Sequence, residues 1–498
     1  MGIIIRQSIK STIVSYVGVG LGIINIVILA TKYFSPVQIG LSRVIFENAL
    51  LFSSFAQLGV PYIAIKYFNH FKDREKKNSG FLFFLLTYGL IGFTFFLVLY
   101  LFSKDLFVNY YRKNSPEIID YYFYLLPIVL FTIYMNILEA FCQVNERIVI
   151  PTVVREIFLK LSNSILILLY AIHLLGFNGY LIGMIVVTGC APVLLAFYLK
   201  QLKKFDLRKD FSWLNRGLLK EMVVYGLFIV LGGIGNMLAT KIDVLMLPAM
   251  TSLQSTGIYV IAIFIATVIE IPKRSIGQIS TPILAQAIHR NDIVQVQDLY
   301  RKTSLNQLIV GSFLFLIIWC NIDSIFLIMP NTEVYRQGKY VVFFIALARL
   351  IDMASGVNTE IILNSKYFRF GLTSIALLAL LTISSNLIFI PLYGINGAAC
   401  AAALSIFIYT LIKLVYVWMK FKIQPYTQRT FQVIACALIT YGITLLLPGK
   451  PDNFVTAILY LVIKSSLILI LFAVIILKFK ISEEVSHIAK VLLKKWTK

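Results

Sequence analysis

Long apolar segments, separated by short polar connections, run through almost the whole of this sequence. A helix needs about 20 apolar residues to cross a bilayer, and about fourteen segments of that kind are present. They lie at about 11–31, 40–65, 80–102, 118–142, 152–174, 180–199, 221–245, 256–283, 305–329, 339–363, 369–390, 395–418, 430–448 and 454–477. Charges interrupt the second and the eighth, so the ends of these two are the least defined. The pattern predicts an all-α integral membrane protein with no room for a separate soluble domain.

Composition excludes a soluble globular protein. Hydrophobic residues make up 59% of the 498 residues, charged residues make up 14%, and the mean hydropathy is +0.86. A soluble domain carries about 25% charged residues. The five cysteines have no C-x-x-C spacing and the four histidines are scattered, so we expect neither a metal site nor a cofactor.

The formal net charge of +22 is distributed unevenly over the connections. With a cytoplasmic N-terminus, basic residues gather in the connections that face the cytoplasm, as the positive-inside rule requires. The main groups are Lys66, Lys72, Arg74, Lys76 and Lys77; Lys200, Lys203, Lys204, Arg208, Lys209 and Arg216; and Lys478, Lys480, Lys490, Lys494, Lys495 and Lys498. We therefore expect both termini to be cytoplasmic, and the basic charge to bind anionic membrane lipid rather than nucleic acid.

A short motif occurs twice, 218 residues apart. Gly176-Phe177-Asn178-Gly179 returns as Gly394-Ile395-Asn396-Gly397, and Ser35 and Gly40 match Ser252 and Gly257 at nearly the same offset. Because each copy falls between similar apolar segments, the sequence predicts one bundle of about six helices present twice in the same orientation. Two parallel repeats that close around a central cavity near the bilayer midplane are a transporter architecture.

This repeat predicts four parts: an N-terminal six-helix lobe at 1–217, a C-terminal six-helix lobe at 218–425, an additional helix pair at 426–478, and a basic cytoplasmic tail at 479–498. We expect each Gly-x-Asn-Gly motif to form a tight outer turn, because glycine and asparagine tolerate positive φ. We expect the motif to make no direct contact with a substrate.

Several loose motifs, spread over both predicted lobes, carry a family resemblance. They are Asn386 to Ala399, Leu58-Gly59-Val60-Pro61, and Asp243-Val244-Leu245-Met246-Leu247 followed by Gly257-Ile258-Tyr259. In order and spacing the chain resembles the Wzx-type family of bacterial polysaccharide flippases. The superfamily of that family also contains lipid II flippases and multidrug cation antiporters.

The resemblance implies two six-helix lobes that open alternately to each side of the bacterial cytoplasmic (inner) membrane. The implied substrate is an undecaprenyl-diphosphate-linked oligosaccharide, moved from the cytoplasmic to the periplasmic leaflet for O-antigen or capsule synthesis. The implied partners are the polysaccharide polymerase and the glycosyltransferases of the same pathway. The additional helix pair favours the lipid-linked sugar branch over the drug antiporters, which typically have twelve spans.

Ionisable residues inside the apolar segments are the candidate functional residues, because burying a charge in a membrane costs about 2.5–3.5 kcal/mol on insertion scales. Candidates for substrate binding are Arg43, Lys241, Lys273, Arg274, Arg349 and Lys464; candidates for ion coupling or salt bridges are Glu47, Asp243, Glu270 and Asp352. Arginine offers planar paired donors that suit phosphate oxygens. Glu270 and Asp352 are also candidates for taking up protons or sodium ions and so coupling transport to an ion gradient.

Two interpretations of these residues stay open. Arg43–Glu47, Glu270–Arg274 and Arg349–Asp352 are each three or four residues apart on one helix face. Each pair either neutralises itself within the helix or lines a wet cavity that binds an anion. Other charges are predicted to lie near cytoplasmic helix ends, where snorkelling suffices: Glu139, Arg155, Glu156, Lys160, Glu360 and Lys413.

Three alternatives compete with the flippase. An ion-coupled multidrug or small-molecule exporter predicts a cavity dominated by carboxylates and aromatics, whereas the cations here at least equal the carboxylates. A lipid II flippase fits the same motifs. A membrane-embedded glycan polymerase or transferase needs a catalytic constellation on a substantial loop, and the outer connection at about 103–117 has one Asp, one Glu and no His. We therefore expect a transporter and not an enzyme.

Overall fold

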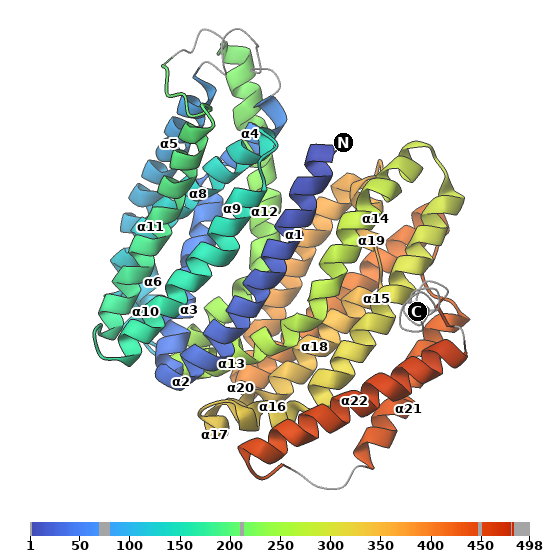
Figure 1. Ribbon diagram of the computed structural model, residues 1–498. Coiled ribbons are helices and arrows are strands. Elements are labelled where there is room, and N and C mark those ends of the chain that lie inside the picture. The colour runs from blue at the N-terminus through green and yellow to red at the C-terminus, as the bar shows by residue number, and fades with distance from the viewer. Residues whose placement is uncertain (1, 69–79, 210–213, 447–450, 480, 483–498) are drawn as a thin grey trace. The chain divides into compact units, whose positions relative to one another are not determined.

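The computed structural model describes residues 2–68, 80–209, 214–446, 451–479 and 481–482 (Figure 1). Every regular element among these residues is a helix, which confirms the predicted all-α class. Within the described residues, nine helices are long and apolar enough to cross a bilayer, from Lys10–Tyr33 to Phe454–Lys478. The count of about fourteen spans stays a prediction. The basic residues predicted at 72–77 and almost all of the predicted tail lie outside the described residues.

The chain divides into two compact units, Met1–Gly257 and Ile258–Lys498. The first unit includes α12 (Arg216–Met250), although the predicted second lobe begins at residue 218. The four predicted parts stay a prediction, and each compact unit is described below by itself.

The first unit is a helical bundle in which α8 packs against α3, α4, α5 and α11. Residues of α8 such as Val129, Ile133 and Phe141 are fully buried there. The helices are α1 (Gly2–Ile23), η1 (Ile24–Ala30), α2 (Thr31–Tyr33), α3 (Pro36–Ala56), α4 (Val60–Tyr67), α5 (Phe81–Phe102), α6 (Lys104–Tyr111), α7 (Glu117–Asp120), η3 (Tyr122–Tyr124), α8 (Leu125–Val144), α9 (Val149–Val153), η4 (Val154–Phe158), α10 (Leu159–Ala171), α11 (Phe177–Gln201) and α12, with the start of α13 (Leu253–Thr267).

The second unit packs α15 against α14, α18, α21 and α22, and α20 against α18 and α19. Leu308, Leu316 and Phe472 belong to one apolar cluster of this unit, and Leu284, Tyr300 and Val417 belong to another. After α13, its helices are η5 (Val268–Glu270), α14 (Ile271–His289), α15 (Ile293–Cys320), α16 (Ile322–Ile328), α17 (Thr332–Tyr335), η6 (Arg336–Gly338), α18 (Lys339–Ala354), α19 (Asn358–Leu363), α20 (Phe368–Phe421), α21 (Gln428–Leu445) and α22 (Phe454–Lys478).

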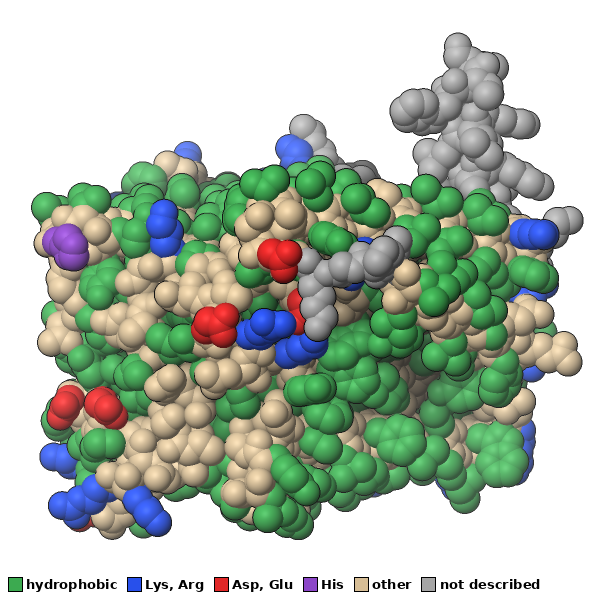
Figure 2. All heavy atoms as spheres, turned by 90° about the horizontal axis from the view of Figure 1, so that it is seen from below, with side chains coloured by type: hydrophobic (Ala, Val, Ile, Leu, Met, Phe, Trp, Pro, Cys, Tyr) green, Lys and Arg blue, Asp and Glu red, His purple; other side chains and the backbone are tan. Residues whose placement is uncertain are grey.

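Large apolar side chains cover the outside of several long helices. Phe95 and Phe102 of α5 and Leu469 of α22 are more than half exposed. Hydrophobic and uncharged side chains also predominate on the face shown in Figure 2, where charged side chains form only small groups. Exposed apolar area of this extent marks a surface that needs an apolar partner. On helices long enough to span a bilayer, that partner is lipid, so the chain is an integral membrane protein.

Both copies of the Gly-x-Asn-Gly motif lie at a break between helices. Gly176 precedes α11, and Gly394 interrupts α20 with φ +55° and ψ −130°. A side chain on Gly397 would place its Cβ 1.9 Å from the carbonyl oxygen of Phe389. The second copy therefore needs glycine at Gly394 for the backbone conformation and at Gly397 for the close approach.

The repeat-matched glycines Gly40 and Gly257 lie in a close contact between α3 and α13. A Cβ on Gly40 would lie 2.1 Å from the carbonyl oxygen of Leu253, and a Cβ on Gly257 would lie 2.0 Å from that of Pro36. Neither position has room for a side chain. The two backbones approach one another as closely as small residues allow in membrane helices.

The second and the eighth predicted segments are each divided into two helices. Between α3 and α4, Leu58 and Gly59 adopt φ +48° and +75°. Between α13 and α14, η5 ends at Glu270, and α14 begins at Ile271 with Pro272, which has no backbone N–H, as its second residue. Interrupted helices near charged side chains are the feature that transporters use to build binding sites.

Candidate functional site

The first unit holds a charged group built around Glu47 of α3. Arg43 Nη2 lies 2.5 Å from Glu47 Oε1, and Lys241 Nζ of α12 lies 2.9 Å from the same oxygen. The Glu47 side chain is only 1% exposed, while Arg43 and Lys241 are 39% and 35% exposed. Two partly exposed cations therefore share one buried carboxylate, which leaves this group with a net positive charge.

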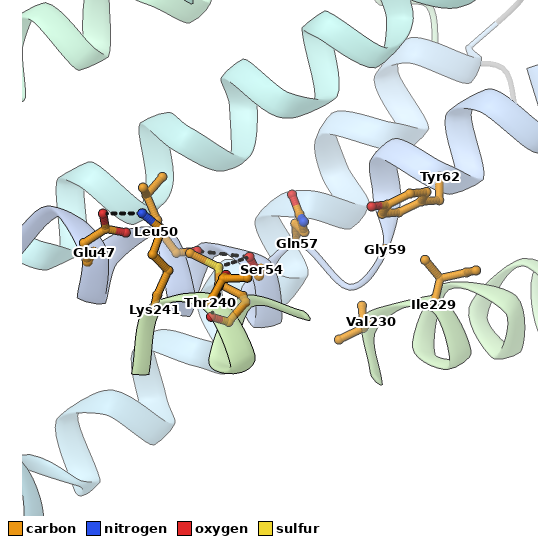
Figure 3. Close-up of a pocket in the computed structure, with 11 residues that line it drawn as sticks. Glu47, Leu50, Ser54, Gln57, Gly59, Tyr62, Ile229, Val230, Thr240 and Lys241 are labelled. Atoms are coloured by element: carbon orange, nitrogen blue, oxygen red, sulfur yellow. Dashed lines mark hydrogen bonds and ion pairs between the residues drawn. The ribbon is translucent and has the colours of Figure 1, made fainter. Parts of the chain in front are cut away.

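A cavity of about 270 Å³ lies beside this group, between α3, the α3–α4 break, α4 and α12 (Figure 3). Its wall combines one carboxylate and one ammonium group with hydroxyl, amide and apolar side chains. The lining residues are Glu47, Leu50, Ser54, Gln57, Gly59, Tyr62, Ile229, Val230, Met237, Thr240 and Lys241. A mostly apolar cavity with a few polar groups is the usual form of a small-ligand site.

The α3–α4 break forms part of the wall of this cavity. Gly59 contacts α12 so closely that a Cβ would lie 2.5 Å from the carbonyl oxygen of Gly226. The left-handed conformation of Leu58 and Gly59 turns the chain between the two helices. Gln57, the last residue before the turn, is thereby placed on the cavity wall (Figure 3).

A second charged group in the second unit connects α14, α18, α19 and α20. Lys273 donates a hydrogen bond to Asp352 Oδ2. Lys413 Nζ lies 4.0 Å from Asp352 Oδ1 and donates to Thr359 Oγ1 at 2.9 Å. The ammonium group of Lys413 also lies 4.1 Å from the centre of the Tyr409 ring, within the range of a cation–π contact. The Lys413 side chain is 2% exposed.

Arg349 of α18 extends this group towards the α13–α14 break. Its Nη1 lies 3.4 Å from Glu270 Oε2, and both side chains are about one-fifth exposed. Two sets of ion pairs, Arg349–Glu270 and Lys273–Asp352–Lys413, thus lie in the second unit. The carboxylate of Glu360 also acts electrostatically on Lys273 and Lys413, so the cations and the carboxylates of this region balance.

Of the two interpretations of the charged pairs, neutralisation within one helix holds for one pair and is wrong for two. Arg43 pairs with Glu47 as expected, but Glu270 pairs with Arg349 rather than with Arg274, and Asp352 pairs with Lys273 and Lys413 rather than with Arg349. The break at Glu270 removes the regular i,i+4 relation to Arg274, and carboxylates on one helix meet cations on another. Arg274 is exposed.

The remaining two candidates are Asp243 and Lys464. Asp243 is buried and its carboxylate accepts a hydrogen bond from the backbone N–H of Val244 at 2.9 Å. Lys464 of α22 lies 5.7 Å from the centre of the Tyr460 ring.

The prediction that Lys413 lies near a helix end and snorkels is wrong. It is one of the largest fully buried side chains, and it lies two turns before α20 ends at Phe421. Its position inside the apolar segment 395–418 was the available signal. Among the described residues, no three His, Cys, Asp or Glu side chains gather in a way that would hold a metal ion.

The fold and the charged groups inside its spans define a helical integral membrane protein with ionised side chains buried between its helices. A family model described as "Polysaccharide biosynthesis protein" matches residues 4–288, and the chain belongs to that family. No curated protein sequence matches the chain.

Solved structures share this fold at low sequence identity. A structure of the lipid II flippase MurJ in an inward closed conformation has a TM-score of 0.75 at 15% identity, covering 95% of this chain and 100% of that one. An inward-facing multidrug resistance MATE family transporter has a TM-score of 0.62 at 12% identity, covering 82% and 94%. A MOP superfamily transporter from Pyrococcus furiosus has a TM-score of 0.58 at 12% identity, covering 84% and 95%.

Proposed function

We propose that this protein is a flippase that moves an undecaprenyl-diphosphate-linked oligosaccharide from the cytoplasmic to the periplasmic leaflet by alternating access. The family match to polysaccharide biosynthesis proteins is the observation that carries the proposal. The two cations that share Glu47 support it, because a diphosphate needs positive charge inside the membrane. The proposed location is the bacterial cytoplasmic membrane, with both termini in the cytoplasm.

In this proposal the protein makes and breaks no covalent bond. The diphosphate binds Arg43, Lys241, Lys273, Arg274, Arg349 or Lys464 while the glycan occupies the wet cavity and the polyprenyl chain stays in lipid. Glu47, Asp243, Glu270 and Asp352 hold these cations in place or take up the coupling ion. The proposed pathway partners are the glycosyltransferases that supply the substrate and the polymerase that consumes it.

Arg349 is the residue whose replacement tests the substrate site most directly. Arg349→Ala should abolish transport, because its guanidinium offers paired donors to phosphate oxygens. Purified protein is reconstituted with the lipid-linked oligosaccharide of its host, and transfer is measured as exposure of the glycan to an enzyme added outside the vesicles. Wild-type transport in the Arg349→Ala protein would remove Arg349 from the site.

The same vesicles separate this function from its alternatives. Lipid II as the transported substrate is the second candidate, because the chain covers the whole of the lipid II flippase structure. Vesicles that carry lipid II should show little transfer if the proposal holds. A dye gradient tests the drug exporter in the same preparation, and dye transport without glycan transfer would overturn the flippase.

Ion coupling is tested by imposing a proton or sodium gradient across the vesicles. Asp352 has two cationic partners, Lys273 and Lys413, so protonation or loss of its charge would release both. Asp352→Asn should therefore transport at a rate that no longer responds to the gradient. An unchanged gradient response would leave Asp352 with a purely structural role.

A further inference from the structure

A chain of hydrogen bonds leads from the π-helical segment η4 to the cavity of the first unit. Arg155 of η4 donates from Nε and Nη2 to the two carboxylate oxygens of Glu139 at 3.0 and 2.6 Å. The same Nη2 donates to Asn136 Oδ1 at 3.0 Å. Asn136 Nδ2 then donates to Gln57 Oε1 at 3.1 Å, and Gln57 lines the cavity. Such π-helical segments are frequent at functional sites.

Arg155 determines the direction of every bond in this chain. A guanidinium has donors and no acceptor, so the Asn136 atom that faces Arg155 must be the amide oxygen. The Asn136 amide nitrogen therefore faces Gln57, and Gln57 must meet it with its own amide oxygen. In the described part of the chain, the hydrogen bond from Asn136 is the one that the Gln57 side chain makes. The two N–H donors of Gln57 remain for the cavity.

We infer that Gln57 donates a hydrogen bond to a phosphate oxygen of the substrate, and that Asn136 and Arg155 are positioning residues that fix its orientation. The inference rests on the proposed function, of which it names a further substrate contact. An ionised phosphate accepts hydrogen bonds and donates none, so it can bind Gln57 in this orientation only. Lys241, on the same cavity wall, supplies the positive charge that such a ligand requires (Figure 3).

Two substitutions of Asn136 separate this role from simple packing. Asn136→Asp keeps the size and the acceptor for Arg155, but it forces Gln57 to turn its N–H donors away from the cavity. Asn136→Leu removes the bond and leaves Gln57 free to rotate. If Asn136 fixes the direction of the Gln57 donors, Asn136→Asp should weaken phosphate binding more than Asn136→Leu does. If Asn136 only supports packing, the isosteric Asn136→Asp should be the milder change.

The probe is geranyl diphosphate, titrated into the full-length protein in detergent, with geranyl glucoside as the neutral ligand. Asn136→Asp should weaken geranyl diphosphate binding about tenfold to a hundredfold, the range of a hydrogen bond to a charged group. Geranyl glucoside binding should change less, because a sugar hydroxyl can donate as well as accept. Gln57→Glu should reproduce the effect directly, since a carboxylate has no donor.

Lys160→Gln is the matched control for Arg155→Gln. Lys160 also forms an ion pair near η4, at 2.6 Å to Glu156, but its other bond goes to the carbonyl oxygen of Gly18. Only Arg155→Gln should weaken geranyl diphosphate binding. Equal effects of the two changes, a milder effect of Asn136→Asp than of Asn136→Leu, or no binding of the probe by wild type would each overturn the inference. If the variants behave as expected but wild-type vesicles transport no lipid-linked oligosaccharide, the proposed function fails and the phosphate contact stands.

Discussion

Because Arg43 and Lys241 share the carboxylate of Glu47, we expect the effects of replacing them on the free energy of unfolding to be strongly non-additive. Each cation alone can neutralise Glu47, since both contact Oε1, at 2.5 and 2.9 Å. Either cation is more than one-third exposed, and partly exposed ion pairs contribute about 0.2–1 kcal/mol. Arg43→Gln or Lys241→Met alone should therefore lower the free energy of unfolding by about 0.5–1 kcal/mol.

The double substitution should cost more than the sum of the single ones. It leaves Glu47, which is 1% exposed, without a cation, and an uncompensated buried charge costs about 3–5 kcal/mol. We take the lower end of this range because Glu47 lines a cavity. About 3 kcal/mol for the double substitution, less about 1.5 kcal/mol for the two single substitutions, leaves a coupling free energy of about 1.5 kcal/mol.

The free energies of unfolding of the wild type, the two single variants and the double variant are measured on purified protein in mixed micelles, with SDS as denaturant. The triple variant with Glu47→Gln added is the control, because it removes the stranded charge and should recover most of the loss. A coupling below about 0.5 kcal/mol, the usual scatter for independent sites, would refute the reasoning. So would a triple variant no more stable than the double.

Three further predictions follow from other parts of the chain. Lys413→Met should lower transport more than Arg274→Ala in the vesicle assay, because Lys413 is buried against Asp352 and Thr359 whereas Arg274 is exposed; equal losses would contradict this. Gly257→Ala should reduce the yield of folded protein and its melting temperature, since the added Cβ would lie 2.0 Å from a backbone oxygen, and Gly20→Ala, where nothing lies within 4 Å, is its control. Gly394→Ala should cost about 1–3 kcal/mol in unfolding free energy from backbone strain alone, because the space around it is open; a neutral effect would show that the turn relaxes.

Sequence reasoning worked where a feature depends on near neighbours in the chain. The apolar segments predicted the helices, the Gly-x-Asn-Gly motif predicted a break, and the four-residue spacing of Arg43 and Glu47 predicted their ion pair. In each case the interacting groups lie within a turn or two of one helix, so periodicity is enough to bring them together.

The same reasoning failed where distant segments decide the contact. Asp352 is bound by Lys273, 79 residues earlier, and Gln57 is bound by Asn136, also 79 residues away. No periodicity relates these positions, because helix packing and not helix geometry brings them together. Lys413 is an example. Its burial depends on α18 and α19, which contact α20 only in the folded unit.

The contact between Gly40 and Gly257 has a consequence for both helices that meet there. Gly40 faces the carbonyl oxygen of Leu253, the first residue of α13, and Gly257 faces that of Pro36, the first residue of α3. The two matched positions therefore make reciprocal contacts. Reciprocal contact between equivalent residues is the property of an isologous dimer interface. A side chain at either glycine therefore disturbs the first turn of both helices, so α3 and α13 constrain one another's sequence at these two positions.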